Sequence, residues 1–197
     1  MDRQDPTQEL WRRLAAADPA EASARAAVAY DPGQQAYVVP LLNASLRIFP
    51  AQRRVDGPEW AAAFEPMLLC VQYLLTAQAE PPAGEWVDPK SLPYGDFFFR
   101  GPHPMPVDGL ERAFGTRREA FCRAAESLGG RPVEMGDAAY VFAVLPRVPV
   151  AVILWLADDE FPARARFLLD KQAHRHLPLD ALWMLCRVLA RRLVQLG

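Results

Sequence analysis

Two uninterrupted apolar runs constrain the fold of this chain more than any other feature. They span residues 138–145 and 148–156, and Pro146 and Arg147 join them. A strand with one face in water alternates polar and apolar residues, whereas a short run that is apolar throughout is typical of a strand buried on both faces. The short connection favours antiparallel neighbours. We therefore predict a hairpin at the centre of a sheet that is covered on both faces.

Patterns on either side of the hairpin predict what surrounds it. Apolar residues recur at helical spacing in three segments: 66–79, 108–128 and 179–196. Residues 163–169 alternate instead, which places Arg164 and Arg166 on one face and predicts a half-exposed strand. These elements predict an α+β fold, in which an antiparallel sheet is packed by several helices.

The first 60 residues predict a smaller helical and hairpin part. Asp5 and Asp18 each precede a proline, which is a start signal for a helix. The second of these helices is predicted to run to about Tyr30. Two short β-branched and aromatic runs, 36–42 and 45–49, then predict a hairpin.

Length and composition indicate one globular domain. The chain has 197 residues, of which 51% are hydrophobic, so we expect a single domain, 1–197, in which residues 1–60 join a core formed by 66–197. The formal net charge of −2 gives no electrostatic reason to expect nucleic acid or an anionic membrane as a partner. The longest apolar run is about half the length that spans a bilayer. Three cysteines without a CxxC pair, behind a polar N-terminus, favour a cytoplasmic location.

A proline-rich central segment, 80–106, is the first candidate for function. An irregular stretch of this length is uncommon in a compact domain and is usually functional or mobile. Its aromatic residues would not be expected in a solvated linker. We therefore expect the segment to wrap the core and to offer four side chains to a ligand: Trp86, Tyr94, Arg100 and His103.

An acidic turn, 158–162, is the second candidate. Its carboxylates, which include Asp159 and Glu160, come directly after the apolar run that ends at Leu156. Binding residues often lie where a buried strand meets an exposed loop. Carboxylates there could hold a hard cation, or one could act as a general base. The plainer interpretation is an acidic turn in water.

His174 and His176 form a His-x-His pair and are candidate metal ligands as well. On a strand the two side chains would share a face and could bind one metal ion. The sequence after Asp170 reads as a turn rather than a strand, and it offers no clear set of four zinc ligands. Structural or surface histidines are the competing interpretation.

Several segments together resemble a bacterial and archaeal family, found largely in anaerobes, that is described only as a domain of unknown function. They include Phe-Arg-Gly-Pro-His at 99–103 and Leu-Pro-Arg-Val-Pro at 145–149, and the most specific part is Asp-Glu-Phe-Pro-Ala at 159–163, followed by Leu169-Asp170 and a closing helix. The resemblance extends from about Pro66 to the end of the chain. It implies a shared fold, and it implies no established activity.

The resemblance also implies a metabolic setting. Some relatives lie fused or adjacent to iron–sulfur modules, which implies a link to corrinoid or iron–sulfur metabolism. This chain lacks the cysteine clusters that ligate an iron–sulfur cluster, so any cluster would sit on a partner. The cofactor itself stays unknown.

These features favour a non-catalytic accessory protein that binds a small ligand or cofactor. The central segment and the acidic turn would meet and line one concave site, in which Arg100 pairs with Glu160 or Asp159. A local pair between Arg100 and Asp96 would instead leave the turn in solvent. Two alternatives stay open: a metal-assisted hydrolase that uses Asp159, Glu160 and the histidines, and a protein-interaction module without a pocket. The sequence identifies neither the small molecule nor a partner protein.

Overall fold

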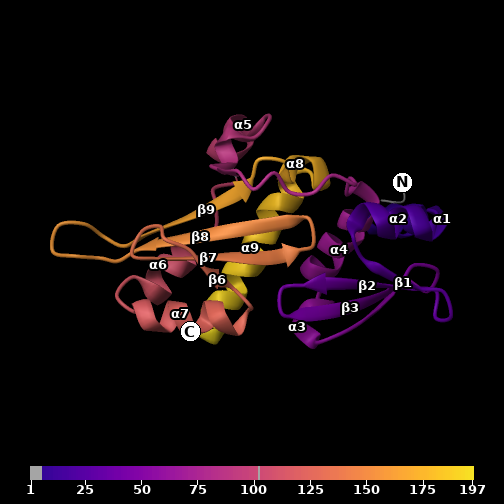
Figure 1. The fold of residues 1–197 in the computed structure, drawn as a ribbon, viewed down its shortest axis with the longest axis horizontal. Helices are drawn as coiled ribbons and strands as arrows, with labels where there is room; N and C mark the ends of the chain where they lie inside the picture. The colour runs from indigo at the N-terminus through magenta and orange to yellow at the C-terminus, as the bar shows by residue number, and fades with distance from the viewer. Residues whose placement is uncertain (1–5, 102) are drawn as a thin grey trace, which may run out of the picture.

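The computed structural model describes residues 6–101 and 103–197 and has an α+β fold, as predicted (Figure 1). A small antiparallel sheet has the strand order β1-β2-β3-β4, and a larger one has the order β5-β9-β8-β7-β6. The strands of the small sheet are β1 (Ala29–Asp31), β2 (Ala36–Leu41), β3 (Ala44–Phe49) and β4 (Arg54–Asp56). Those of the large sheet are β5 (Trp86–Val87), β6 (Arg131–Pro132), β7 (Ala138–Leu145), β8 (Val148–Trp155) and β9 (Arg164–Asp170).

Helices cover one face of the large sheet and flank the small one. They are α1 (Pro6–Ala16), α2 (Pro19–Ala26), α3 (Glu59–Ala62), α4 (Phe64–Thr76), α5 (Gly95–Arg100), α6 (Asp108–Phe114), α7 (Arg118–Ser127), α8 (Ala173–His176) and α9 (Leu179–Leu196), with a 3-10 turn η1 (Pro89–Ser91). In Figure 1 the long helix α9 crosses behind the large sheet. Among the described residues no helix combines the length and apolar character needed to cross a membrane.

The predicted central hairpin is confirmed. β7 and β8 pair antiparallel on either side of Pro146 and Arg147. Val150, Val152 and Leu154 are buried on one face of β8, and the residues between them are buried as well. The strand β9 pairs with the other side of β8 and alternates as predicted, so that Arg164 and Arg166 are exposed while Phe167 is buried. The uninterrupted apolar runs thus correctly predict the buried strands β7 and β8, and the alternation of polar and apolar residues correctly predicts the half-exposed strand β9.

Two predicted helices end earlier than the sequence indicated. The segment 108–128 forms two helices, α6 and α7, because the chain turns at Gly115, whose carbonyl accepts a hydrogen bond from the Ala157 N–H at 2.8 Å. A Cβ at Gly115 would clash with Ala163, so the close approach requires glycine. The second N-terminal helix stops at Ala26 rather than near Tyr30, since Ala27 adopts the left-handed conformation and β1 follows. Its cap is Asp18, as predicted, whereas Asp5 lies outside the described residues.

The central segment is more regular than its sequence suggests. β5, η1 and α5 all lie within 80–106. β5 adds a two-residue strand to the edge of the large sheet, where Trp86 pairs with Asp170. The Asp170 carboxylate, which is only 1% exposed, accepts the backbone N–H groups of Ala83, Gly84 and Gln172 at 2.7–3.0 Å. A buried carboxylate thus fixes the start of the segment to the end of β9.

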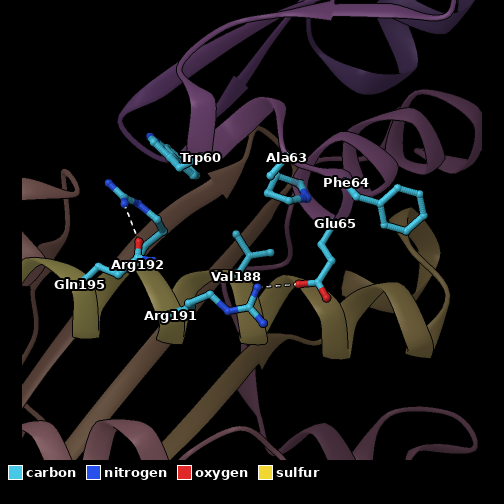
Figure 2. A pocket seen from close by; sticks show the side chains of 9 residues that line it. Trp60, Ala63, Phe64, Glu65, Val188, Arg191, Arg192 and Gln195 are labelled. Carbon is cyan, nitrogen blue, oxygen red and sulfur yellow. Dashed lines mark hydrogen bonds and ion pairs between the residues drawn. The ribbon is translucent and has the colours of Figure 1, made fainter.

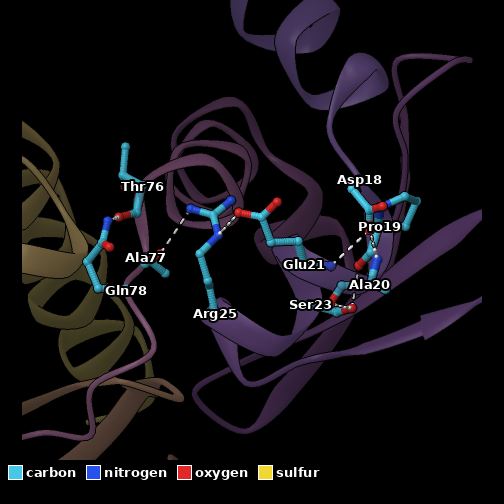
Figure 3. A network of polar contacts seen from close by, with 9 residues as sticks. All are labelled: Asp18, Pro19, Ala20, Glu21, Ser23, Arg25, Thr76, Ala77 and Gln78. Carbon is cyan, nitrogen blue, oxygen red and sulfur yellow. Dashed lines mark hydrogen bonds and ion pairs between the residues drawn. The ribbon is translucent and has the colours of Figure 1, made fainter.

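Polar contacts join the N-terminal part to the large sheet. Leu42 donates its N–H to the carbonyl of Val144. The Tyr73 hydroxyl donates to the Ala26 carbonyl at 2.7 Å and accepts the N–H of Arg147 at 3.1 Å. Figure 3 shows a related contact, from the Arg25 guanidinium to the carbonyl of Ala77 after α4. One hydrophobic cluster continues beneath these contacts through both parts.

Candidate functional site

The structure does not bring the central segment and the acidic turn together. Trp86 pairs with β9 at Asp170, whereas the turn 158–162 precedes the other end of β9, at Arg164. Six residue steps along a strand are about 20 Å. Figure 1 accordingly shows α5 above the sheet and the β8–β9 connection at its far left. The structure therefore does not contain the single concave site, shared by the two segments, that the sequence predicted.

The side chains predicted in the central segment have other surroundings. Arg100 forms its ion pair with Asp96 at 2.9 Å, one turn away on α5, and not with Asp159 or Glu160. Tyr94 is exposed, and Trp86 is half-buried in the edge strand β5. The ring of His103 stacks on Phe98 with the centroids 4.4 Å apart. The local alternative that the sequence left open, Arg100 with Asp96, is the one that the structure contains.

The two candidate metal ligands point in different directions. They lie on the short helix α8, where residues two apart do not share a face. His174 is partly exposed, and its Nδ1 lies 3.1 Å from the Lys171 carbonyl. His176 is buried, and its Nδ1 accepts the Gln78 N–H at 3.3 Å. Within residues 6–101 and 103–197 no group of three or more His, Cys, Asp or Glu side chains could hold a metal ion.

A hollow does lie beside the acidic turn, and we call it the tip hollow. Its volume is about 470 Å³. It lies at the end of the β8–β9 hairpin and is lined by Asp137, Trp155, Leu156, Asp158, Phe161, Pro162, Arg164 and Arg166. Asp159 and Glu160 belong to the same turn but are exposed outside this lining. The turn therefore contributes to a concavity, although with different side chains from those predicted.

Hydrogen bonds to two aspartates hold the walls of the tip hollow in place. Asp158 Oδ1 accepts the N–H groups of Glu160 and Phe161, at 2.9 and 2.7 Å. The N–H groups of Phe161 and Glu160 stabilise the charged carboxylate and so lower the pKa of Asp158. Asp137 Oδ2 accepts the Leu156 N–H at 2.7 Å. Both carboxylates thus shape the chain around the hollow.

Two arginines and a tryptophan supply the binding chemistry of the tip hollow. Arg164 and Arg166 lie on the same face of β9, and Trp155 is the register partner of Arg164 on β8. The Arg166 guanidinium lies 5.9 Å from the centroid of the Trp155 ring. In the described part of the chain neither arginine forms an ion pair with a carboxylate within 4.0 Å. Their planar, permanently charged forks are therefore available to a carboxylate or phosphate.

Sequence reasoning missed these residues for an identifiable reason. The alternation in 163–169 placed both arginines on one exposed face, and that was the available signal. Trp155 was grouped with the core because it ends an apolar run, yet it is half-buried at the last position of β8. Only the β8–β9 register brings it opposite Arg164.

Two further hollows lie along α9, and two of the arginines that line them, Arg187 and Arg191, form ion pairs. Figure 2 shows one of about 380 Å³ between Trp60, Phe64 and Arg191. Glu65 forms ion pairs with Arg187 and with Arg191, the latter at 3.0 Å. The second hollow, which we call the α9 groove, has a volume of about 520 Å³ and is lined by Pro104, Met105, Pro106, Asp108, Gly109, Trp183, Arg187, Ala190, Arg191, Val194 and Gln195. Glu65 neutralises both arginines of the α9 groove, which makes this groove a weaker candidate for an anion than the tip hollow.

Comparisons with known proteins identify a family and no function. A family model described as a domain of unknown function (DUF3786) matches residues 18–192. Neither a curated protein nor a solved structure matches the chain. The geometry of the hollows is therefore the evidence on function.

Proposed function

Because the chain belongs to the DUF3786 family, for which no function is given, we propose a function from geometry: it is a non-catalytic binding protein whose tip hollow takes a small anionic ligand. The observation that carries this proposal is the pair Arg164 and Arg166, which lack carboxylate partners in the described chain and lie beside Trp155. Arginine pairs suit carboxylate and phosphate groups because both can be bound bidentately.

The rest of the lining supports a ligand with an apolar body as well as an anionic group. Trp155, Leu156 and Phe161 supply apolar and aromatic surface. A hollow of about 470 Å³ lies within the range of small-molecule sites, which are mostly apolar with a few placed polar groups. The anionic group would face the arginines while the body lies against the aromatic rings.

The residues around the tip hollow favour binding over catalysis. Its lining contains no histidine, cysteine or serine. Asp158 is held ionised by two N–H groups, so it is a poor general acid, and Asp137 is occupied with the Leu156 N–H. This chemistry supports the accessory role over a metal-assisted hydrolase. A cytoplasmic location remains part of the proposal, supported by free cysteines of which Cys70 and Cys186 are buried.

Calorimetric titration of the purified protein tests this function with three probes: inorganic phosphate, adenosine monophosphate and cyanocobalamin. Comparing the affinities for phosphate and adenosine monophosphate shows whether an aromatic group attached to the anion strengthens binding. Cyanocobalamin tests the corrinoid link that the family resemblance implies. We expect Arg164→Ala and Arg166→Ala each to weaken binding about tenfold or more, because a hydrogen bond to a charged group contributes about 1.5–3 kcal/mol.

The matched control is Arg13→Ala, an exposed arginine on the distant helix α1. It should leave the affinity unchanged. Wild-type protein that binds none of the three probes would count against the proposal, and so would binding that survives loss of both arginines. A metal ion that co-purifies in stoichiometric amount would favour the hydrolase instead.

A further inference from the structure

The short helix α5 presents two of the most exposed aromatic side chains described. Tyr94 is 87% exposed and Phe97 is 90% exposed. Figure 1 shows α5 projecting from the edge of the large sheet. We call Tyr94 and Phe97 with their helix the α5 knob. Isolated exposed apolar residues are ordinary, but two adjacent aromatics on a projecting element are typical of a contact surface.

The base of the α5 knob packs against the rest of the molecule. Phe99 is buried, and Phe98 stacks on His103. Tyr94 is in the left-handed region, with φ of 61°, which a bulky residue rarely adopts. A Cβ at Gly95 would clash with the Pro89 carbonyl oxygen, so α5 sits directly on η1. The exposure of Tyr94 and Phe97 therefore comes from a helix that is itself packed on its inner side.

The α9 groove lies next to the base of this knob. The His103 ring, stacked on Phe98, meets the edge of Trp183 with the centroids 5.5 Å apart. Trp183 lines the groove, and its Nε1 donates to the Pro104 carbonyl at 2.8 Å. A continuous row of rings thus leads from the knob to a mostly apolar groove in the same molecule.

We propose that the chain forms a two-fold symmetric dimer in which the α5 knob of each copy enters the α9 groove of the other. An adjacent projection and hollow become mutually complementary when a two-fold axis passes between them, and such an interface closes after two copies. The groove supplies the surface that Tyr94 and Phe97 lack, since Met105, Ala190 and Val194 line it. This inference is independent of the ligand proposed for the tip hollow.

The expected area suits a stable dimer. Each aromatic side chain buries about 150–250 Å². Four of them, two from each copy, bury about 600–1,000 Å², and the two grooves lose a similar area. The total of about 1,200–2,000 Å² is that of a specific protein interface.

Sedimentation equilibrium of the full chain tests the dimer. We expect wild-type protein to show twice the chain mass of 22.0 kDa. Phe97→Ser on the knob and Val194→Asp in the groove should each sediment as a monomer, with unchanged circular dichroism because both positions are exposed. Phe161→Ser, which removes an exposed aromatic from the tip hollow, is the matched control and should stay dimeric.

A mixture of the two variants gives the sharpest result. Phe97→Ser keeps an intact groove and Val194→Asp keeps an intact knob, so a mixed dimer regains one of the two contacts. We expect the mixture to associate more strongly than either variant alone. Wild-type protein that is monomeric throughout the concentration range would overturn the inference, as would a Phe97→Ser variant that remains dimeric. Association of the mixture no stronger than that of the separate variants would overturn the knob-in-groove geometry.

Discussion

Replacing Asp170 tests how the central segment is attached to the sheet. This carboxylate is almost fully buried, and its Oδ1 accepts the N–H groups of Ala83 and Gln172 while Oδ2 accepts that of Gly84. A hydrogen bond to a charged group contributes about 1.5–3 kcal/mol, so three of them set an upper limit of about 5–9 kcal/mol. Ala83 and Gly84 are exposed, so water can take up their N–H groups after the change. We therefore expect Asp170→Ala to lower the free energy of unfolding by about 3–4 kcal/mol.

Asp170→Asn keeps the size of the side chain but replaces one of its two acceptor oxygens with an NH₂ group. An amide has one oxygen, so its NH₂ group must face at least one of the three backbone donors. Keeping the oxygen at the Oδ1 position preserves the bonds to Ala83 and Gln172 and loses the one to Gly84. The expected loss is about 2 kcal/mol, smaller than for alanine but clear.

Urea denaturation measures both variants. With a slope of about 2 kcal/mol per molar urea, the midpoint should fall by about 1.5–2 M for alanine and about 1 M for asparagine. Asp88→Asn is the control, because Asp88 accepts a single N–H, from Lys90, and such a cap contributes about 1 kcal/mol. Faster amide hydrogen exchange in residues 83–87 should accompany the loss at Asp170. An Asp170→Asn midpoint equal to that of the wild type would refute the reasoning.

Three other predictions concern the core, pH and α5. Val152→Asp should yield no folded protein, because an unpaired charge at this buried position costs several kcal/mol, comparable to the whole stability of a domain; a cooperative melt of a soluble variant would contradict the strand assignment. Burial, and then the positive charge of Arg147, lower the pKa of His176 below its ordinary value of 6.5, so the unfolded chain binds more protons below that pH. Stability should thus be complete above pH 6.5 and fall as the pH drops through the window below it, and His176→Gln should flatten that part of a pH-dependent melting series. Gly95→Ala should lower the melting temperature and speed exchange in α5, because the methyl group would meet the Pro89 carbonyl; unchanged exchange would show that α5 does not rest on η1.

Much of the fold could be predicted because the strongest signals are local. The apolar runs of β7 and β8 and the alternation of β9 are properties of consecutive residues. The break between α6 and α7 was not predictable in this way. Gly115 is one of many glycines in the sequence, and its carbonyl leaves the helical pattern only because it accepts the N–H of Ala157, a residue distant in the chain.

The predicted site failed where distant pairing decides the outcome. The sequence carries no signal for which end of β9 the central segment joins. In the structure the buried carboxylate of Asp170 binds the start of the segment and so determines that end. Arg100 had a partner at helical spacing in Asp96, and a local pair costs less chain entropy than a distant one. The acidic turn was correctly placed at the end of β8, but the cations beside it come from the next strand and not from the segment 80–106.

Within the part of the chain that the structure describes, the short strand β5 leaves most of one side of β9 without a neighbouring strand. It pairs only with Leu169 and Asp170, so the backbone from Arg164 to Leu168 forms an open edge. Open edges invite strand addition and aggregation. Glu111 of α6 accepts the Ala165 N–H at 2.9 Å and so occupies one donor that an incoming strand would need. The charged side chains of Arg164 and Arg166 lie on the same stretch of β9, and charged residues at an open edge disfavour the addition of a strand from another molecule. The two arginines that line the tip hollow therefore also protect this edge against intermolecular β-sheet growth.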